Sequence, residues 1–288
     1  MSQVELHYLT CHRDFEDFLL SVRTFFYWNT VKWKLVVHSD GSLTKDEMNY
    51  IRDNFDSRVI DREEADVKVL DFLKEYPYCY DWRKNFKKKA NYVMFQKIFD
   101  PMVFCEDYYV LFDSDVFFYD KDEFIIKYAK NKTPFYHGGG WGFLTYPVSY
   151  KNMLTIGFKP VGNLNGGLIG FKKDMFQIKL IEKYFKLIEE NPGKIDNKIG
   201  FCFNLEESLF SCLMGMNKET KVIWCGNFDE KTPEYAKTKS GKVYGICSNL
   251  TWFSPNNSIC IHYADTTKFA INFGRKMAKS KMKQGEGK

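Results

Sequence analysis

Residues 4–38 read VELHYLTCHRDFEDFLLSVRTFFYWNTVKWKLVVH and contain a strand, a helix and a second strand in that order. Val4–Thr10 has the apolar content of a strand. Asp14–Trp28 places its apolar residues at helical spacing and begins with Asp, which often caps a helix N-terminus. Lys34–His38 is the second strand and ends in the turn residues Ser39-Asp40-Gly41. The stretch therefore predicts the strand–helix–strand unit from which parallel sheets are built.

The same alternation continues beyond this stretch. Thr44 and Glu47 have capping-box spacing and predict a helix that ends at about Phe55. A short strand at Arg58–Ile60 and a helix at Glu63–Glu75 follow. We therefore expect an α/β fold, a single Rossmann-like domain whose mostly parallel central sheet is flanked by helices.

Ligands of such sheets bind outside the carboxyl ends of the strands. The loops Thr10–Arg13 and His38–Ser42 each follow a predicted strand and so lie where a nucleotide would bind. Thr10 and Asp40 are the candidate binding residues within them.

The rest of the chain mixes helices and strands, with no internal repeat and no linker between domains. The pattern predicts a solvated basic run at 83–89, helices at 90–99, 174–190, 205–216 and 266–283, strands at 108–112, 163–171, 221–225 and 258–262, and a Gly-rich aromatic loop at 134–147.

Composition excludes some classes of protein. The net charge of +5 is too small to indicate a nucleic-acid binder. The eight cysteines are scattered without a CxxC pair, which predicts free thiols in a reducing compartment. Residues 1–9 have no signal-peptide pattern, and no apolar run is long enough to span a bilayer. A cytoplasmic location is therefore expected.

The stretch most informative about chemistry is 109–118, YVLFDSDVFF, where an apolar strand ends in Asp113 and Asp115. Two carboxylates at the end of a buried strand are costly unless a positive charge lies beside them. A divalent cation meets this need, and hard oxygen ligands suit Mg²⁺ or Mn²⁺. Two alternatives stay open: a surface turn with two solvated aspartates, and a phosphatase that forms an aspartyl phosphate.

With these residues the chain resembles the GT-A-fold glycosyltransferases, and within them the glycogenin and bacterial galactosyltransferase type. Asp113-Ser114-Asp115 matches the DxD motif of that family, which implies that both carboxylates reach a Mn²⁺ or Mg²⁺ ion and that Ser114 lies at the donor. Lys97 lies sixteen residues before Asp113, where the family has a basic residue near the donor. An exposed helix lysine is the alternative for Lys97.

Two further segments resemble the family's motifs in the expected order. Asn165-Gly166-Gly167 is similar to its Asn-Ser-Gly strand entry, which implies contacts with donor sugar hydroxyls. Glu206 and Glu207 fall where the family has an acidic residue and Gln, and we take both as candidate catalytic residues. An acid at a helix N-terminus also compensates the helix dipole, which is the alternative for Glu206. The change from Gln to Glu leaves the role of Glu207 open.

The segment from Ile261 to Lys268 is similar to the family's His-aromatic-x-Gly-x-x-Lys segment. The resemblance implies that His262 completes the metal shell and that Lys268 binds the diphosphate. The family's Gly is Asp265 here, and its following Pro-Trp is Phe269-Ala270, which predicts a different loop shape.

The resemblance implies a metal-dependent transfer of sugar from a nucleotide-diphosphate sugar, with UDP as the expected nucleotide, to a hydroxyl of a glycan or glycoconjugate. Residues 1–120 would form the nucleotide-sugar-binding half, 121–265 the acceptor-side half and 266–288 a basic C-terminal helix or tail. That helix has the cations and apolar residues for weak contact with an anionic membrane surface, although a solvated tail is the simpler alternative. Aromatic residues such as Trp141, Trp252 and Phe253 either line an acceptor cleft or belong to the core.

Retention and inversion at the sugar both stay open. So do two other functions: a phosphatase of the aspartyl-phosphate type, and a non-catalytic module that binds nucleotide sugars or glycans.

Overall fold

The structure is a computed structural model. It describes residues 4–29, 32–89, 93–138, 150–190, 205–225, 239–246, 254–263 and 268–285. Among these residues, no helix is both long and apolar enough to cross a membrane.

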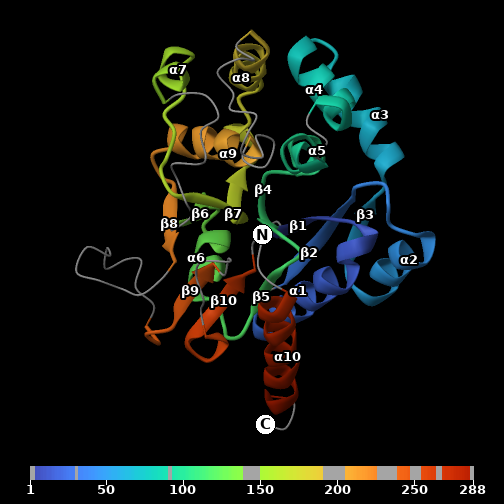
Figure 1. Cartoon of the computed structure of the whole chain (residues 1–288), viewed down its shortest axis with the longest axis vertical. Coiled ribbons are helices and arrows are strands. Elements are labelled where there is room, and N and C mark those ends of the chain that lie inside the picture. Colours follow the sequence, from blue (N-terminus) through green and yellow to red (C-terminus); the bar gives the residue numbers. More distant parts are fainter. Residues whose placement is uncertain are drawn as a thin grey trace.

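A seven-stranded sheet lies at the centre of the molecule, in the order β3-β2-β1-β4-β7-β6-β8 (Figure 1). Its strands are β1 (Val4–Thr10), β2 (Trp33–Ser39), β3 (Ser57–Ile60), β4 (Tyr108–Phe112), β6 (Phe135–Gly138), β7 (Leu164–Lys172) and β8 (Lys221–Trp224). The pairs from β3 to β4 are parallel, as is β6 with β8, whereas β7 runs antiparallel to both β4 and β6. The predicted mostly parallel α/β sheet is confirmed.

A second, smaller sheet consists of β5 (Val116–Phe118), β10 (Ser258–His262) and β9 (Val243–Ile246). β10 runs antiparallel to β5, and this register places His262 opposite Val116. Because Val116 follows Asp115 directly, the pairing brings the end of β10 to the acidic motif. The sequence analysis did not identify β5 as a strand, because its three residues continue the apolar run that follows the two aspartates.

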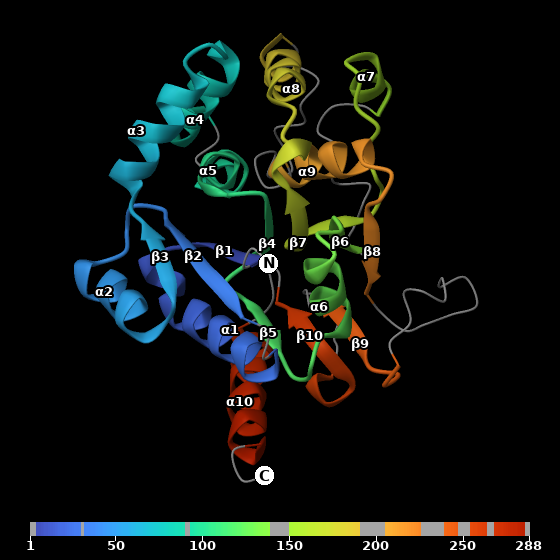
Figure 2. The ribbon, with the colours of Figure 1, turned by 180° about the vertical axis from the view of Figure 1, so that it is seen from behind.

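Helices cover both faces of the large sheet (Figure 2). They are α1 (Phe15–Trp28), α2 (Lys45–Asn54), α3 (Arg62–Leu73), α4 (Pro77–Lys89), α5 (Gln96–Phe104), α6 (Glu123–Lys130), α7 (Tyr150–Thr155), α8 (Ile178–Glu190), α9 (Leu205–Met216) and α10 (Lys268–Gly285). Strand β4 shows the two-sided burial, because alternate side chains of a strand point to opposite faces. Tyr109 and Leu111 pack with α3, α4, α5, α8 and α9, whereas Val110 and Phe112 pack with α1, α2 and α6.

The basic run at 83–89, expected in a solvated loop, is the last part of α4, and that prediction is wrong. Arg83 is fully buried. Its guanidinium donates to Asp66 Oδ1 at 2.6 Å and to Asp100 Oδ1 at 3.0 Å. A buried arginine is tolerated only when such partners neutralise it. Since Asp100 belongs to α5, the pair fixes α4 against the helix that carries Lys97.

The predicted helix cap at the start of α2 is present, whereas the one at the start of α1 is not. Thr44 and Glu47 form the predicted capping box at the start of α2. Asp14 precedes α1 as predicted, but its side chain makes no capping hydrogen bond. It accepts hydrogen bonds from Arg13 and Cys11 instead.

Candidate active site

Three chain segments meet at the carboxyl end of β4. Asp113 follows β4 directly, and its backbone N–H donates to the carbonyl of Gly167 at 3.0 Å. The backbone N–H of Tyr263 donates to the carbonyl of Asp115 at 3.1 Å. These backbone bonds hold the acidic motif between the start of β7 and the end of β10.

Asp113, Asp115 and His262 form a cluster that can hold a metal ion. His262 Nε2 lies 3.2 Å from Asp115 Oδ1 and 3.6 Å from Asp113 Oδ2. One ligand atom from each residue falls within 4.8 Å of the other two. Two carboxylate oxygens and one imidazole nitrogen at these separations suit Mn²⁺ or Mg²⁺, with further positions left for water or phosphate. The three predicted metal ligands are therefore brought together.

The orientation of His262 is set by Asn165. The Asn165 Oδ1 accepts from the backbone N–H of Gly167 at 3.1 Å and lies 2.7 Å from His262 Nδ1. Because this oxygen only accepts, Nδ1 carries a hydrogen, and Nε2 faces the two carboxylates. A hydrogen bond of this kind on the far nitrogen is typical of metal-binding histidines.

Electrostatics within the cluster match a site built for a cation. Burial alone would lower the pKa of His262, but Asp115 and Asp113 raise it above its ordinary value. Burial alone would raise the pKa of Asp115, but His262 and Lys97 lower it. The same carboxylates that favour a proton on His262 also favour a bound cation.

Gly167 is required by the close packing of the site. A Cβ at this position would lie 2.3 Å from His262 Nδ1 and 2.4 Å from its Cε1, well inside contact distance. From the sequence, Gly167 was expected to lie at the donor sugar. In the structure, the side chain that it admits is His262.

Lys97 is buried and forms an ion pair with Asp113 Oδ1. Burial alone would lower the pKa of this ammonium, but Asp113 and Glu206 raise it above its ordinary value. The exposed-lysine alternative is wrong, because the side chain is only 4% exposed. Lys97 therefore supplies a fixed positive charge beside the candidate metal site.

Glu206 and Glu207 begin α9 and lie next to the same cluster. Glu207 Oε1 accepts from the backbone N–H of Gly166 at 2.8 Å. Burial raises the pKa of Glu207, while Gly166, His262 and Lys97 act in the opposite direction. Glu206 is 4% exposed and contributes to the raised pKa of Lys97. Both carboxyl groups therefore lie close enough to the charged centre to interact with it.

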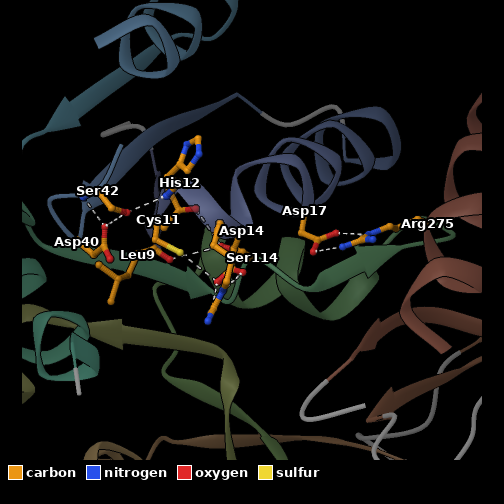
Figure 3. A network of polar contacts seen from close by, with 11 residues as sticks. Leu9, Cys11, His12, Asp14, Asp17, Asp40, Ser42, Ser114 and Arg275 are labelled. Atoms are coloured by element: carbon orange, nitrogen blue, oxygen red, sulfur yellow. Dashed lines mark hydrogen bonds and ion pairs between the residues drawn. The ribbon is translucent and has the colours of Figure 1, made fainter. Parts of the chain in front are cut away.

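The other predicted donor residues lie at the ends of β1 and β2. Ser114 Oγ is 3.3 Å from Thr10 Oγ1, and the backbone N–H of Asp40 donates to the Thr10 carbonyl at 3.1 Å. Asp40 Oδ1 accepts from the backbone N–H and the hydroxyl of Ser42, at 2.8 and 2.6 Å (Figure 3). These contacts join Thr10, Asp40 and Ser114 in one polar edge.

A cavity opens beside this edge, at the ends of β2 and β3. Asp40 lines it together with Arg62, Asp66 and Lys84. The cavity is lined by Asp40 but by none of the three candidate metal ligands. The cavity reaches from the polar edge to α3 and α4.

Sequence reasoning did not single out two side chains of this edge. Asp14 lies close enough to Asp115 for the two charges to interact. His12 Nδ1 pairs with Glu47 Oε1 at 2.8 Å, which links the β1 loop to α2. Their position just beyond a strand end was the signal that would have found them.

Lys268 is exposed at the start of α10, so its predicted diphosphate contact stays a prediction. Asp265 lies outside the described residues, as do Trp141, Trp252 and Phe253.

Comparison with known proteins identifies the fold of this chain. No protein-family model and no curated protein sequence matches the chain. Among solved structures, the chain is similar to the galactosyltransferase LgtC in complex with donor and acceptor sugar analogues, with a TM-score of 0.53 and 11% identity over 98% of this chain and 96% of that one. It is also similar to mouse xyloside xylosyltransferase 1 in its apo form, with a TM-score of 0.51 and 10% identity over 93% of this chain and 100% of that one. The GT-A glycosyltransferase fold expected from the sequence is therefore confirmed.

Proposed function

We propose that this protein is a metal-dependent glycosyltransferase. It takes a sugar from a nucleotide-diphosphate sugar, with UDP as the proposed nucleotide, and moves it to a hydroxyl of a glycan or glycoconjugate. The observation that carries the proposal is the meeting of Asp113, Asp115 and His262 in a GT-A fold, with Asn165 fixing the histidine. The predicted cytoplasmic location is part of the proposal and rests on the cysteines, which are free thiols in the described part of the chain.

The chemistry needs positive charge where a diphosphate leaves the sugar. A Mn²⁺ or Mg²⁺ ion held by Asp113, Asp115 and His262 would neutralise charge on the leaving diphosphate. Lys97 is fixed beside the same carboxylates and adds charge that does not depend on the metal. Preorganised charge of this kind lowers a barrier because it does not reorganise during the reaction.

The remaining residues would orient the two substrates. Thr10, Asp40 and Ser114 form the polar edge proposed to bind the nucleoside. Asn165–Gly167 and Glu206 are proposed to lie along the sugar. Lys268, at the start of α10, is proposed to reach the diphosphate. Holding the reactants in reacting geometry is the second large contribution to rate in such an enzyme.

The role proposed for Glu207 depends on whether the transfer inverts or retains the configuration of the sugar. Its carboxyl group is fixed by the Gly166 N–H and lies within the charged centre. As a base for the acceptor hydroxyl it would give inversion, and as a group that stabilises the sugar cation it would fit retention. The stereochemistry of the product decides between the two roles.

The testing experiment measures thermal unfolding with a panel of nucleotide-diphosphate sugars, each with and without Mn²⁺. A ligand that binds the native state raises the unfolding midpoint by mass action. We expect a metal-dependent rise with one UDP-sugar in the wild type and none in Asp115→Ala. Asp107→Ala is the matched control, because Asp107 lies at the opposite end of β4 and is 61% exposed.

The outcomes separate the proposal from its alternatives. Donor binding with transfer to a sugar acceptor supports a glycosyltransferase. Donor binding with no transfer or hydrolysis would indicate a non-catalytic module. No shift with any nucleotide sugar in the presence of Mn²⁺, together with phosphate release from a generic ester, would indicate the phosphatase.

A further inference from the structure

Helix α10 (Lys268–Gly285) leaves the body of the protein at the end opposite α3, α4, α7 and α8 (Figures 1 and 2). Its 18 residues contain six cationic side chains and no acidic one. At 1.5 Å per residue, such a helix is about 27 Å long.

The inner face of α10 is closely fitted to the protein. A Cβ on Gly274 would lie 2.3 Å from Tyr263 Cζ, and Ala278 is fully buried. Tyr119 OH lies 2.7 Å from Tyr263 OH and donates to the Gly274 carbonyl at 3.3 Å. Ile271, Met277 and Met282 pack against the same apolar cluster, so small and large side chains together seat the helix.

Two side-chain contacts fix the rotation of the helix about its axis. Arg275 donates to both carboxylate oxygens of Asp17, each at 2.5 Å (Figure 3). Near the other end, Lys281 Nζ donates to the Pro255 carbonyl at 2.8 Å. The same face of α10 is therefore always turned outward.

That outer face combines apolar and cationic side chains. Phe269 is 76% exposed and Phe273 is 36% exposed, one turn further along. Lys276, Lys279 and Lys283 are exposed on the same side, at the spacing of successive helical turns. Two phenylalanines held in water beside lysines have the composition of a helix that lies in the headgroup region of a bilayer.

We propose that the outer face of α10 is a docking surface for an anionic lipid bilayer. The helix would lie along the surface, with Phe269 and Phe273 inserted between headgroups and the three lysines against acidic lipid. Charge complementarity favours this partner. The helix has no acidic side chain of its own, and Asp17, the carboxylate that neutralises Arg275, belongs to α1 and lies on the inner side of the helix. This proposal extends beyond glycosyl transfer, since vesicle binding requires neither donor nor metal.

The test is sedimentation of the full-length protein with phosphatidylcholine vesicles, with and without added phosphatidylserine. We expect the wild type to bind the anionic vesicles and to be released as salt is raised. Changing Lys276, Lys279 and Lys283 to Glu should reduce the partition coefficient by at least about a hundredfold, because each lysine near an anionic surface contributes about 1 kcal/mol and each new carboxylate is repelled. Phe269→Ser with Phe273→Ser should reduce it about tenfold.

The matched control lies on α8, at the opposite end of the molecule. Lys179, Lys183 and Lys186 are exposed on one face of α8 at similar spacing, but that helix also carries acidic residues. Changing these three lysines to Glu alters the net charge equally and should leave vesicle binding unchanged. Circular dichroism of each variant shows that it is folded.

Three outcomes would overturn the proposal. In the first, the wild type fails to bind anionic vesicles at low salt. In the second, the α8 variant loses as much binding as the α10 variant. In the third, light scattering finds a wild-type dimer that the two serine substitutions convert to a monomer. That result would assign the face to a second copy of this chain.

Discussion

Asn165 Oδ1 accepts a hydrogen bond from His262 Nδ1 at 2.7 Å, so a residue expected to contact the donor sugar also orients a candidate metal ligand. The same oxygen accepts the Gly167 N–H, which holds the amide in one orientation. Metal affinity should therefore depend on a residue that is not itself a ligand.

Replacing Asn165 by Leu should weaken Mn²⁺ binding about 10- to 100-fold, because His262 loses the partner that fixes its ring and tautomer. Isothermal titration of the metal-free protein with Mn²⁺ measures the change. Asn165→Asp keeps an accepting oxygen and should bind Mn²⁺ more tightly than the leucine variant. An unchanged Mn²⁺ affinity in Asn165→Leu would show that this hydrogen bond does not support metal binding by His262.

Gly167→Ala tests the packing at the same place. The added methyl meets the His262 ring, so we expect a loss of about 1–3 kcal/mol in the free energy of unfolding, together with weaker Mn²⁺ binding. The matched control is Gly162→Ala, because a Cβ there has nothing within 4 Å. Chemical denaturation measures both variants. Equal stability of the two would mean that the ring has room to move.

The supporting network around the candidate site could be predicted only in part. Asp113, Asp115 and His262 were found because strand ends and motif order are visible along the chain. The bond from Asn165 to His262 joins residues 97 positions apart, and nothing in either segment alone indicates it. For Arg83, the local sequence pattern gave a wrong prediction. A run of lysines around it predicts solvent, whereas Asp66 and Asp100, from two other helices, offset the cost of burying it.

Asp122 should give the protein a dependence of stability on pH. Burial raises its pKa to about 7, although Tyr244 and the N–H groups that it caps act against this. Its Oδ2 has no hydrogen-bond partner among the described residues and can carry the proton. The folded state then holds a proton that the unfolded chain has lost. The stabilising contribution is complete below pH 4 or so, the unfolded pKa, and is lost as the pH rises towards about 7.

The check compares the free energy of unfolding of the wild type and Asp122→Asn between these pH values. Asn keeps the oxygen that caps Ile125 and accepts from Tyr244. The difference between the two proteins should change by about 1.4 kcal/mol per pH unit, in favour of the variant as the pH rises. Asp107→Asn, at an exposed carboxylate, is the control for the substitution itself. Parallel curves for the wild type and Asp122→Asn would contradict the raised pKa.

Glu207→Gln isolates the chemistry of the carboxyl group from its place in the structure. A Gln side chain can still accept the Gly166 N–H through its oxygen, so the geometry at the start of α9 should be kept. What is lost is the ability to ionise. If Glu207 takes or stabilises charge during transfer, turnover should fall by about 10²- to 10⁴-fold, while donor and Mn²⁺ affinities stay close to wild type.

The control for this variant is Glu219→Gln, because Glu219 is 69% exposed and its ion pair with Lys172, at 3.0 Å, lies at the surface. Nuclear magnetic resonance of the anomeric proton in the wild-type product then separates the two roles of Glu207. If turnover is lost in Glu207→Gln, inversion fits Glu207 as the base for the acceptor hydroxyl, and retention fits it as the group that stabilises the sugar cation. Wild-type turnover in Glu207→Gln would exclude both, and Glu206 would then be the remaining carboxyl group at the start of α9.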